Sequence, residues 1–353
     1  MIAARALVPM ALVAATAPPF AYPVVTPNRV FAFPADHGAH PDYRTEWWYI
    51  TGMVAGKDGQ PIGFQVTFFR TRPSANPNNP SAFAASQVLF AHVALSDPAT
   101  GHILHDERAA RAGFGLAGAR LGDADIHIRD WRLVRSTDGR FTTHIAARGF
   151  ALDLTFTPTQ APLLQGQHGY SRKGPSPTEA SYYYSLPQMR VAGQISQAKT
   201  VRPVRGKAWL DREWSSNYLN PAAVGWDWTG LNFSDGSALM AFRIRRKDGS
   251  TLWSGGSYRR AAGQVVTLAP GEITFAPSRR WTSAKTGATY PIAQSLTIRL
   301  PEGQRGFVLN PIMADQELDA RRSGLPIYWE GAVTTPGGSG YLELTGYAGP
   351  MKM

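Results

Sequence analysis

The chain has 353 residues, which favours two domains, and its 43% hydrophobic and 11% aromatic content excludes a disordered chain. It has no cysteine, which excludes disulfides, zinc thiolate sites and a cysteine nucleophile. The 36 Lys and Arg outnumber the 25 Asp and Glu and give a formal charge of +11, but these cations occur in short groups. We therefore interpret the charge as a source of solubility, with attraction to acidic lipid head groups as an option, and expect no nucleic acid partner.

Residues 1–21 have the pattern of a signal peptide. Arg5 precedes an apolar run from Ala6 to Ala17 that is too short to span a bilayer. Cleavage is expected after Ala17 or Ala21, and an uncleaved anchor is the alternative because the start carries only one cation. The mature protein is therefore expected to be periplasmic or secreted, with peripheral membrane contact as an option.

The segment from residue 28 to 195 reads as a series of short strands. Trp47–Val54 and Ile62–Arg70 are joined by Asp58-Gly59, a pair typical of a tight hairpin turn. Further strands are expected at Gln87–Leu95, Ile126–Val134, Thr142–Arg148 and Phe150–Thr157. Helical periodicity is confined to a weak candidate at Asp106–Leu116.

The first turn-rich stretch raises the question of a metal. His37, His40 and Glu46 could form a zinc site, because His-x-x-His followed by a carboxylate supplies suitable ligands. The spacing in a Pro- and Gly-containing loop instead favours turn and hydrogen-bonding roles. No metal or other cofactor is expected.

The segment from residue 200 to 353 repeats the same pattern of strands and Asp-Gly turns. Its strands are expected at Trp226–Phe233, Leu239–Arg246, Thr251–Tyr258, Gln264–Leu268, Ser295–Leu300, Phe307–Leu309, Ile327–Val333 and Gly340–Tyr347. Glu46-Trp47 recurs as Glu213-Trp214, and Trp48–Gly52 resembles Trp226–Gly230. We infer an all-β fold with two similar β-barrel domains in tandem, at residues 28–195 and 200–353.

The stretch Gly206–Gly230, GKAWLDREWSSNYLNPAAVGWDWTG, is the candidate functional centre. Tryptophans suit the wall of an apolar ligand cavity, and a carboxyl group among them loses solvation, so that its pKa rises towards the range of a proton donor. The candidate donors are Asp211, Glu213 and Asp227. The alternative is that the tryptophans are core residues and that Asp211 and Glu213 merely pair with Arg212.

Several of these segments together resemble the carotenoid 1,2-hydratase-like family, also called the lipocalin-like AttH family. The resemblance rests on FPADHGAHPDYRTEWWYITG (33–52), GKAWLDREWSS (206–216), GWDWTGLNFSDGSALMAFRIR (225–245), WTSAKTGATYP (281–291), YWEGAV (328–333) and GYLELTGY (340–347). It implies two lipocalin-like barrels that share a ligand site near their interface. The expected substrate-binding residues are Trp48, Trp214, Trp226, Trp228, Tyr258, Glu330 and Tyr347, of which Glu330 and Tyr347 rest on the resemblance alone.

The resemblance leaves two functions open. Characterised relatives hydrate a terminal double bond of acyclic carotenoids or act on other apolar unsaturated substrates, which implies an acid-catalysed hydratase or isomerase. The exported bacterial branch often accompanies an ABC transport system, which implies a lipophile carrier or chaperone. The carotenoid-converting branch carries Asp-His-Asn-Trp where this chain has Asp211-Arg212-Glu213-Trp214, so a proton-relay histidine is missing at this position.

Overall fold

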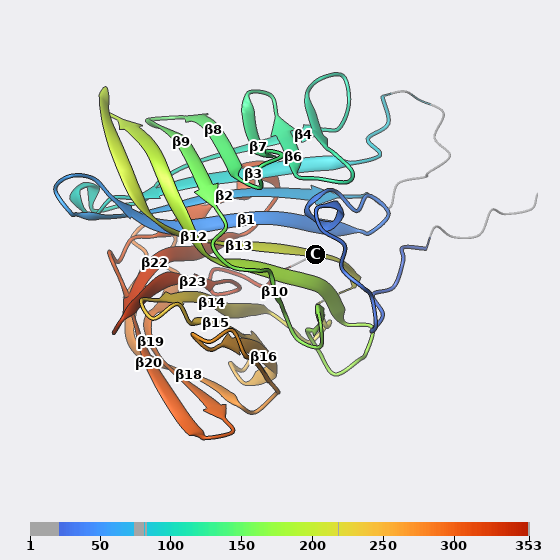
Figure 1. The fold of residues 1–353 in the computed structure, drawn as a ribbon, viewed down its shortest axis with the longest axis vertical. Coiled ribbons are helices and arrows are strands. Elements are labelled where there is room, and N and C mark those ends of the chain that lie inside the picture. The colour runs from blue at the N-terminus through green and yellow to red at the C-terminus, as the bar shows by residue number, and fades with distance from the viewer. Residues whose placement is uncertain (1–20, 74–80, 82, 218, 352–353) are drawn as a thin grey trace, which may run out of the picture.

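A computed structural model of the chain describes residues 21–73, 81, 83–217 and 219–351, so residues 1–20 of the expected signal peptide lie outside the described part. The described residues form two antiparallel sheets that lie one above the other, each curled around its own core (Figure 1). The expected all-β fold with two lipocalin-like barrels is confirmed. The helical elements described are the short 3-10 turns η1 (Ala35–His37), η2 (Pro98–Thr100) and η3 (Arg321–Ser323). No helix in these ranges is long and apolar enough to cross a bilayer.

The first sheet has 13 strands in the order β4-β3-β2-β1-β13-β12-β9-β8-β7-β6-β5, with β10 and β11 added beside β12. Their bounds are β1 (Thr45–Ala55), β2 (Pro61–Thr71), β3 (Val88–Ser96), β4 (Leu104–Arg111), β5 (Ala117–Ala119), β6 (Asp125–Ile128), β7 (Trp131–Arg135), β8 (Phe141–Ala147), β9 (Phe150–Thr157), β10 (Leu163–Leu164), β11 (Tyr170–Arg172), β12 (Ala180–Gln197) and β13 (Thr200–Asn217). The sheet curls until Arg108 of β4 donates to the carbonyl of Ile128 in β6.

The second sheet has 10 strands in the order β17-β16-β15-β14-β23-β22-β20-β19-β18, with β21 added beside β22. Their bounds are β14 (Gly225–Phe233), β15 (Ala238–Arg245), β16 (Thr251–Arg259), β17 (Val265–Leu268), β18 (Ile273–Thr282), β19 (Thr289–Leu300), β20 (Gly303–Pro311), β21 (Glu317–Asp319), β22 (Ile327–Thr335) and β23 (Gly338–Leu344). Arg243 of β15 reaches across the curl and donates to the carbonyl of Phe275 in β18.

The two longest strands, β12 and β13, form one hairpin within the first sheet. Ala198 and Lys199, at its tip, both have positive φ angles of 48° and 67°, as a type I′ turn requires. The sequence-based domain limits of 195 and 200 therefore fall at this turn. Residues 200–217 belong to the first sheet, where β13 pairs with both β1 and β12.

The two Glu-Trp dipeptides are neighbours in space. On β1 and β13, Glu46 lies opposite Trp214 and Trp47 lies opposite Glu213. The two dipeptides are therefore cross-strand partners in one sheet. Glu46 and Trp214 face the core of the first barrel, whereas Trp47 and Glu213 face the second sheet.

Most expected strands are present, and the differences have local causes. Gly59, Gly139, Gly236 and Gly249 adopt positive φ angles at the four Asp-Gly turns, which confirms these hairpins. The helix candidate Asp106–Leu116 is wrong: β4 occupies its first half, because pairing with β3 outweighs a weak helical pattern. The strand expected at Ile126–Val134 is divided into β6 and β7 by a turn in which Arg129 has a φ of 55°.

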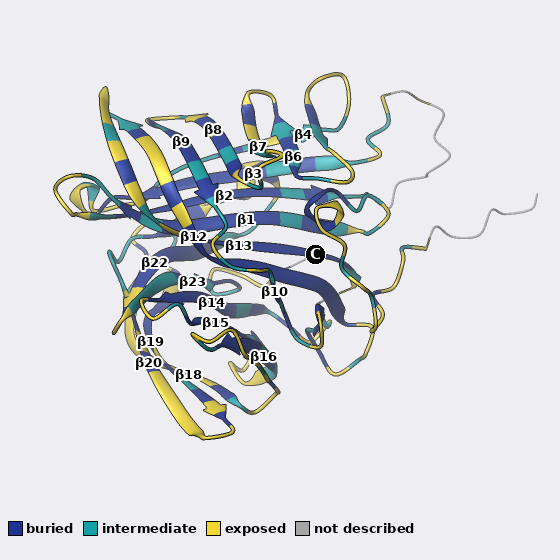
Figure 2. Ribbon diagram, in the orientation of Figure 1, coloured by how far each residue is buried: buried dark blue, intermediate teal, exposed yellow. Residues whose placement is uncertain are grey.

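The strands where the two sheets meet are buried along much of their length, whereas the outer hairpin tips are exposed (Figure 2). A third apolar cluster, separate from the two barrel cores, joins Tyr183 and Trp209 of the first sheet to Trp228 and Tyr341 of the second. A smaller cluster, with Ala94 of the first sheet and Leu318 and Tyr328 of the second, also crosses between the sheets. The described part of the molecule is therefore held together by two barrel cores, this interface core and the smaller cluster.

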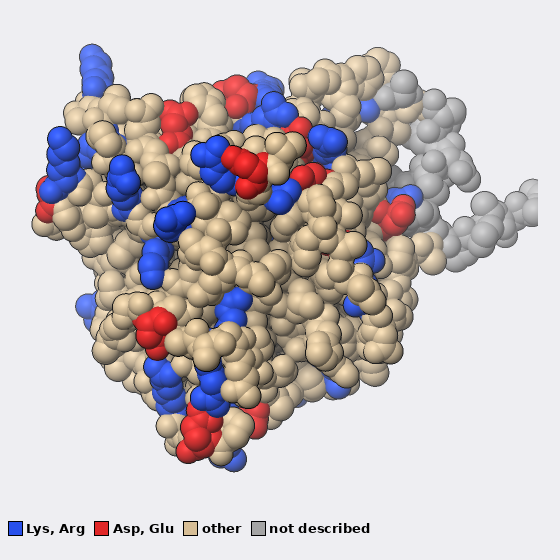
Figure 3. All heavy atoms as spheres, viewed as in Figure 1, with Lys and Arg blue, Asp and Glu red and all other residues tan. Residues whose placement is uncertain are grey.

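Charged side chains are dispersed over the visible face of the molecule, with Lys and Arg interspersed among Asp and Glu (Figure 3). Salt bridges such as Arg132–Asp125 and Arg260–Glu302 pair some of these charges at the surface. On this face the basic residues form no continuous band of the kind that would follow a nucleic acid backbone.

Candidate functional site

Strand β13 presents two different faces, because successive side chains of a strand point to opposite sides. Leu210 and Trp214 belong to the core of the first barrel, whereas Trp209 belongs to the interface core. Asp211 and Glu213 share the face of Trp209 and so point towards the second sheet. The acidic and aromatic stretch found in the sequence is thus divided between a barrel interior and an interface.

A cavity of about 310 Å³ opens between the two sheets on this face. This size is at the lower end of the range for small-molecule sites. Its aromatic wall comes from both sheets and includes Trp47, Tyr49, Tyr183, Trp226, Trp228 and Tyr341. Four carboxyl groups also line it: Asp211, Glu213, Glu330 and Glu343.

Asp211 is buried and accepts hydrogen bonds from four donors. Tyr183 and Ser185 donate from β12 at 2.6 and 2.5 Å, and Trp209 donates at 2.8 Å. Tyr341 donates from the second sheet at 2.5 Å. Burial raises the pKa of Asp211, and these hydrogen bonds oppose the rise because they stabilise the charged form. Asp211 therefore ties the two sheets together at the cavity wall.

Glu213 has a buried cation beside it. Lys173 Nζ lies 3.1 Å from Glu213 Oε1, and the hydroxyl of Ser181 donates to the same oxygen. Burial raises the pKa of Glu213, while the Lys173 ammonium opposes that rise. The same burial lowers the pKa of Lys173. Of the four cavity carboxyl groups, Glu213 is thus the one that a cation helps to keep charged.

Glu330 and Glu343, unlike Glu213 and Lys173, are a pair of two carboxyl groups. They lie directly opposite each other on β22 and β23, where cross-strand Cβ atoms are about 5 Å apart. Tyr49 donates to Glu330, and Gln65 donates to it at 2.8 Å. No salt bridge joins either carboxyl group to a described Lys, Arg or His.

Two such groups cannot both be charged at neutral pH. Burial raises the pKa of Glu330 well above its usual range, and the neighbouring Glu343 charge adds to the rise. Burial also raises the pKa of Glu343, to about 8. Because the pKa of Glu343 lies above neutral pH, this carboxyl group holds a proton at neutral pH.

A hydrogen-bonded chain leads away from this pair. Gln65 donates to Tyr328 at 3.3 Å, and the Tyr328 hydroxyl lies 2.9 Å from His92 Nδ1. His92 Nε2 lies 3.0 Å from Ser323 Oγ, which donates to Glu107 at 2.6 Å. Because Ser323 gives its proton to Glu107, His92 donates from Nε2 and accepts from Tyr328 at Nδ1. Burial lowers the pKa of His92 to about 3, so the ring is neutral.

Two of the expected site residues lie inside the second barrel instead of at the cavity. Asp227 stands between Trp226 and Trp228 on β14, so its side chain takes the opposite face. It pairs there with Arg243 and Arg245 and accepts from the Tyr347 hydroxyl at 2.8 Å. Contrary to the sequence-based expectation, Asp227 and Tyr347 do not line the cavity.

Three more expected residues are core residues. Trp48 and Trp214 belong to the core of the first barrel, and Tyr258 belongs to that of the second. The Arg212 guanidinium stacks over Trp48 at 3.9 Å, and Arg305 donates to the Tyr258 hydroxyl. The structure therefore brings Asp211, Glu213, Trp226, Trp228 and Glu330 together at the cavity and separates the other five expected residues from it.

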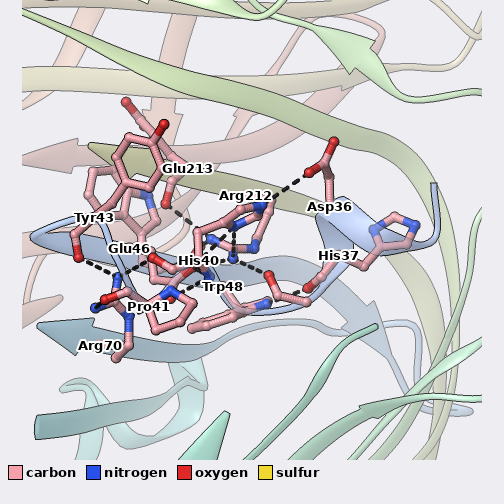
Figure 4. Close-up of polar contacts among 12 residues, drawn as sticks. Asp36, His37, His40, Pro41, Tyr43, Glu46, Trp48, Arg70, Arg212 and Glu213 are labelled. Carbon is pink, nitrogen blue, oxygen red and sulfur yellow. Dashed lines mark hydrogen bonds and ion pairs between the residues drawn. The ribbon is translucent and has the colours of Figure 1, made fainter. Parts of the chain in front are cut away.

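Arg212 takes part in an ion-pair network inside the first barrel. Figure 4 shows Glu46 between the side chains of Arg70 and Arg212, with His40 beside them. Burial alone would raise the pKa of Glu46, but the two guanidinium groups hold it well below its usual range. Because position 212 faces this network, the histidine expected from the carotenoid-converting branch would not reach the cavity from here.

His37 and His40 have hydrogen-bonding roles in the same region. His37 Nδ1 lies 2.6 Å from the Tyr184 hydroxyl, and His40 Nε2 lies 3.0 Å from Asp36. The His40 ring also stacks on Trp214 with centroids 3.8 Å apart. Within the described residues no cluster of three or more His, Cys, Asp or Glu could hold a metal ion.

Sequence reasoning missed several residues that line the cavity or lie beside it. Glu343 lies between Leu342 and Leu344, a pattern that reads as a strand with its polar face in water. Lys173 lies in a loop rich in Gly, Pro and Ser. Tyr183 could have been found, because it is the middle one of three consecutive tyrosines on a strand and its side chain must point to the other face from those of Tyr182 and Tyr184.

The comparisons with known proteins agree with this fold. The profile of the AttH family, described as AttH-like, matches residues 24–347. The crystal structure of an AttH protein from Nitrosomonas europaea is 50% identical, covers 92% of this chain and 99% of its own, and has a TM-score of 0.85. No curated protein gives a significant match.

Two more distant structures share the fold. Kievitone hydratase from Nectria haematococca is 15% identical, with a TM-score of 0.69 over 93% of this chain and 94% of its own. CghA, crystallised with Sch210972, is 16% identical, with a TM-score of 0.52 over 86% of this chain and 89% of its own.

Proposed function

Because this chain belongs to the AttH-like family, we propose that it adds water to, or isomerises, a carbon–carbon double bond of an apolar substrate by acid catalysis in the interface cavity. The observation that carries the proposal is the pair Glu330 and Glu343. Two carboxyl groups face each other in a largely aromatic cavity without a described cationic partner. Such a pair keeps a transferable proton at neutral pH.

The reaction starts at Glu343. Its carboxyl group gives its proton to one alkene carbon, so that a C–H bond forms as the π bond breaks and the other carbon becomes a carbocation. Trp47, Trp226 and Trp228 offer ring faces to this cation, and each contributes on the order of 1 to 2 kcal/mol when water is excluded. Ring faces and carboxylates together favour the charged transition state over the neutral substrate.

Glu213 completes the reaction as a base. Lys173 helps to keep its carboxylate charged, so it can accept a proton from the water that attacks the cation as the C–O bond forms. The proton returns to Glu343 through water in the cavity, and the net change is the addition of one water molecule. If Glu213 instead removes a proton from the cation itself, the product is an isomeric alkene.

The test is incubation with candidate alkenes in isotope-labelled water, followed by mass spectrometry of the products. Kievitone is one probe, because a structural relative is named as its hydratase; prenylated phenols, linear polyenes and unsaturated lipids are the others. Glu343→Gln should slow product formation by about 100-fold or more, the usual contribution of a general acid. Glu302→Gln, which makes the same change at the surface, should leave the rate unchanged. Wild-type turnover in Glu343→Gln would remove Glu343 from this role.

A lipophile carrier is the second candidate, and the apolar wall of the cavity supports it. In that case an envelope ABC transporter and a periplasmic location are the partner and setting we propose. Native mass spectrometry of protein taken from its source separates the two functions. A retained and chemically unchanged lipid, together with no turnover of any alkene, would favour the carrier.

A further inference from the structure

The interface of the two sheets already holds one ammonium group, that of Lys173. Its Nζ lies 4.8 Å from the ring of Tyr183, 4.7 Å from that of Trp228 and 4.6 Å from that of Phe242. Ring faces at this distance attract a cation. Glu213 neutralises the charge at 3.1 Å, and the side chain of Lys173 is only 1% exposed. The protein thus stabilises a fully buried ammonium with three rings and one carboxylate.

The cavity has the same two features, ring faces and carboxyl groups, and the Arg44 and Arg70 side chains that also line it form no salt bridge with Glu330 or Glu343. Tyr183 and Trp228, which contact Lys173, also line the cavity, as do Trp47, Trp226 and Tyr341. Across it lie Glu330 and Glu343, which no described cation pairs. Tyr49 and Gln65 donate to Glu330, while Glu343 keeps some exposure towards the cavity. The rings and the carboxyl pair are independent features, and both are complementary to positive charge.

We propose that this cavity binds a lipophilic organic cation, an ammonium group with apolar substituents, with its charge against the Glu330–Glu343 pair, which releases a proton to solvent on binding, and its apolar part against the tryptophans. The volume of about 310 Å³ admits a small ammonium head and part of a chain. Ile244, Leu325 and Phe90 add apolar surface for the substituents. An inorganic cation would leave these apolar walls unused, and a neutral lipid would leave the carboxyl pair unmatched.

This inference does not depend on catalysis. A cation at this position would resemble the carbocation of the proposed reaction, but a carrier with the same cavity would bind it equally well. Failure of the hydration test would therefore leave the cation site standing, and failure to bind cations would leave hydration to its own test.

The experiment compares two probes of nearly equal shape by isothermal titration calorimetry below their micelle concentrations. Octyltrimethylammonium carries a permanent charge, and the neutral comparator is octyl dimethyl carbinol. We expect the cation to bind at least about tenfold more tightly, a difference of about 1.4 kcal/mol. Glu343→Gln should remove most of that difference and keep the affinity for the alcohol. Glu302→Gln, a matched surface variant, should change neither affinity.

Two results would overturn the inference: equal binding of the two probes by the wild type, or undiminished cation binding by Glu343→Gln. Because Glu343 is uncharged at neutral pH, the change to Gln keeps both the size and the neutral state of the side chain, so the variant should fold. Its affinity for the alcohol serves as the check that the cavity is intact. Glu330→Gln provides a second variant, with the same expected loss of cation preference.

Discussion

Replacing Lys173 with methionine tests the charge arrangement beneath the cavity. The change keeps an unbranched apolar side chain among Tyr183, Trp228 and Phe242 but leaves the carboxylate of Glu213 buried without its cation. Breaking a buried ion pair from one side costs about 3 to 5 kcal/mol. Because Glu213 can take up a proton instead, we expect the lower end, about 3 kcal/mol of unfolding free energy at neutral pH.

The same pair can be removed from both sides. Glu213→Gln alone leaves the ammonium of Lys173 buried and should also cost about 3 kcal/mol, whereas the double variant leaves no unpaired charge and should lose only about 1 kcal/mol. Urea unfolding followed by tryptophan fluorescence measures all four proteins. A double variant that loses the full sum of the two single losses, about 6 kcal/mol, would refute a direct charge pairing.

The pH dependence of Lys173→Met gives an independent check. Without the ammonium, burial raises the pKa of Glu213 further above its unfolded value, because only the hydrogen bond from Ser181 still opposes the rise. A raised pKa stabilises the folded state at low pH and loses this effect as the pH rises through the folded-state pKa. The destabilisation caused by Lys173→Met should therefore shrink as the pH falls. A penalty that is constant with pH would show that the lysine acts only through packing.

Three further predictions address the supporting structure. Hydrogen bonds to Asp36 outweigh its burial and lower its pKa from 3.8 to about 2. Its carboxylate should therefore contribute about 2 kcal/mol to the unfolding free energy above pH 4, and this contribution should be lost as the pH falls to 2. Asp36→Asn should flatten this part of the stability curve in urea titrations. In Gly230→Ala the new Cβ would lie 2.6 Å from the Tyr341 ring, so calorimetry should find weaker probe binding, and unchanged binding would contradict this packing. Asp227→Asn should cost about 3 to 5 kcal/mol by leaving Arg245 unpaired, yet leave probe affinity unchanged in the folded protein.

The fold was largely accessible from the sequence because strand signals are local. Alternating side chains and Asp-Gly turns mark most strands, and the turns require a positive φ that glycine adopts freely. The pairing of β13 with β1 was not accessible in the same way. It depends on the packing of segments 150 to 170 residues apart, and Thr200–Asn217 carries no turn signal that assigns it to either barrel.

The site was accessible in part. Asp211 and Glu213 were found because acidic and aromatic residues are unusually close together in Gly206–Gly230. Asp227 was included for the same reason, although alternation along a strand already places it opposite Trp226 and Trp228. Glu343 was missed because a glutamate between two leucines is also the pattern of a solvated strand face. Only the packing of one sheet on the other buries it.

The central claim is that Glu343 holds a proton at neutral pH while facing the cavity. Infrared difference spectroscopy tests this directly, because a protonated carboxyl group has a C=O band that a carboxylate lacks. We predict that the carboxylic acid band at pH 7 is stronger in the wild type than in Glu343→Gln, and that this difference disappears as the pH is raised through about 8. A wild-type spectrum at pH 7 identical to that of Glu343→Gln in this region would contradict the account.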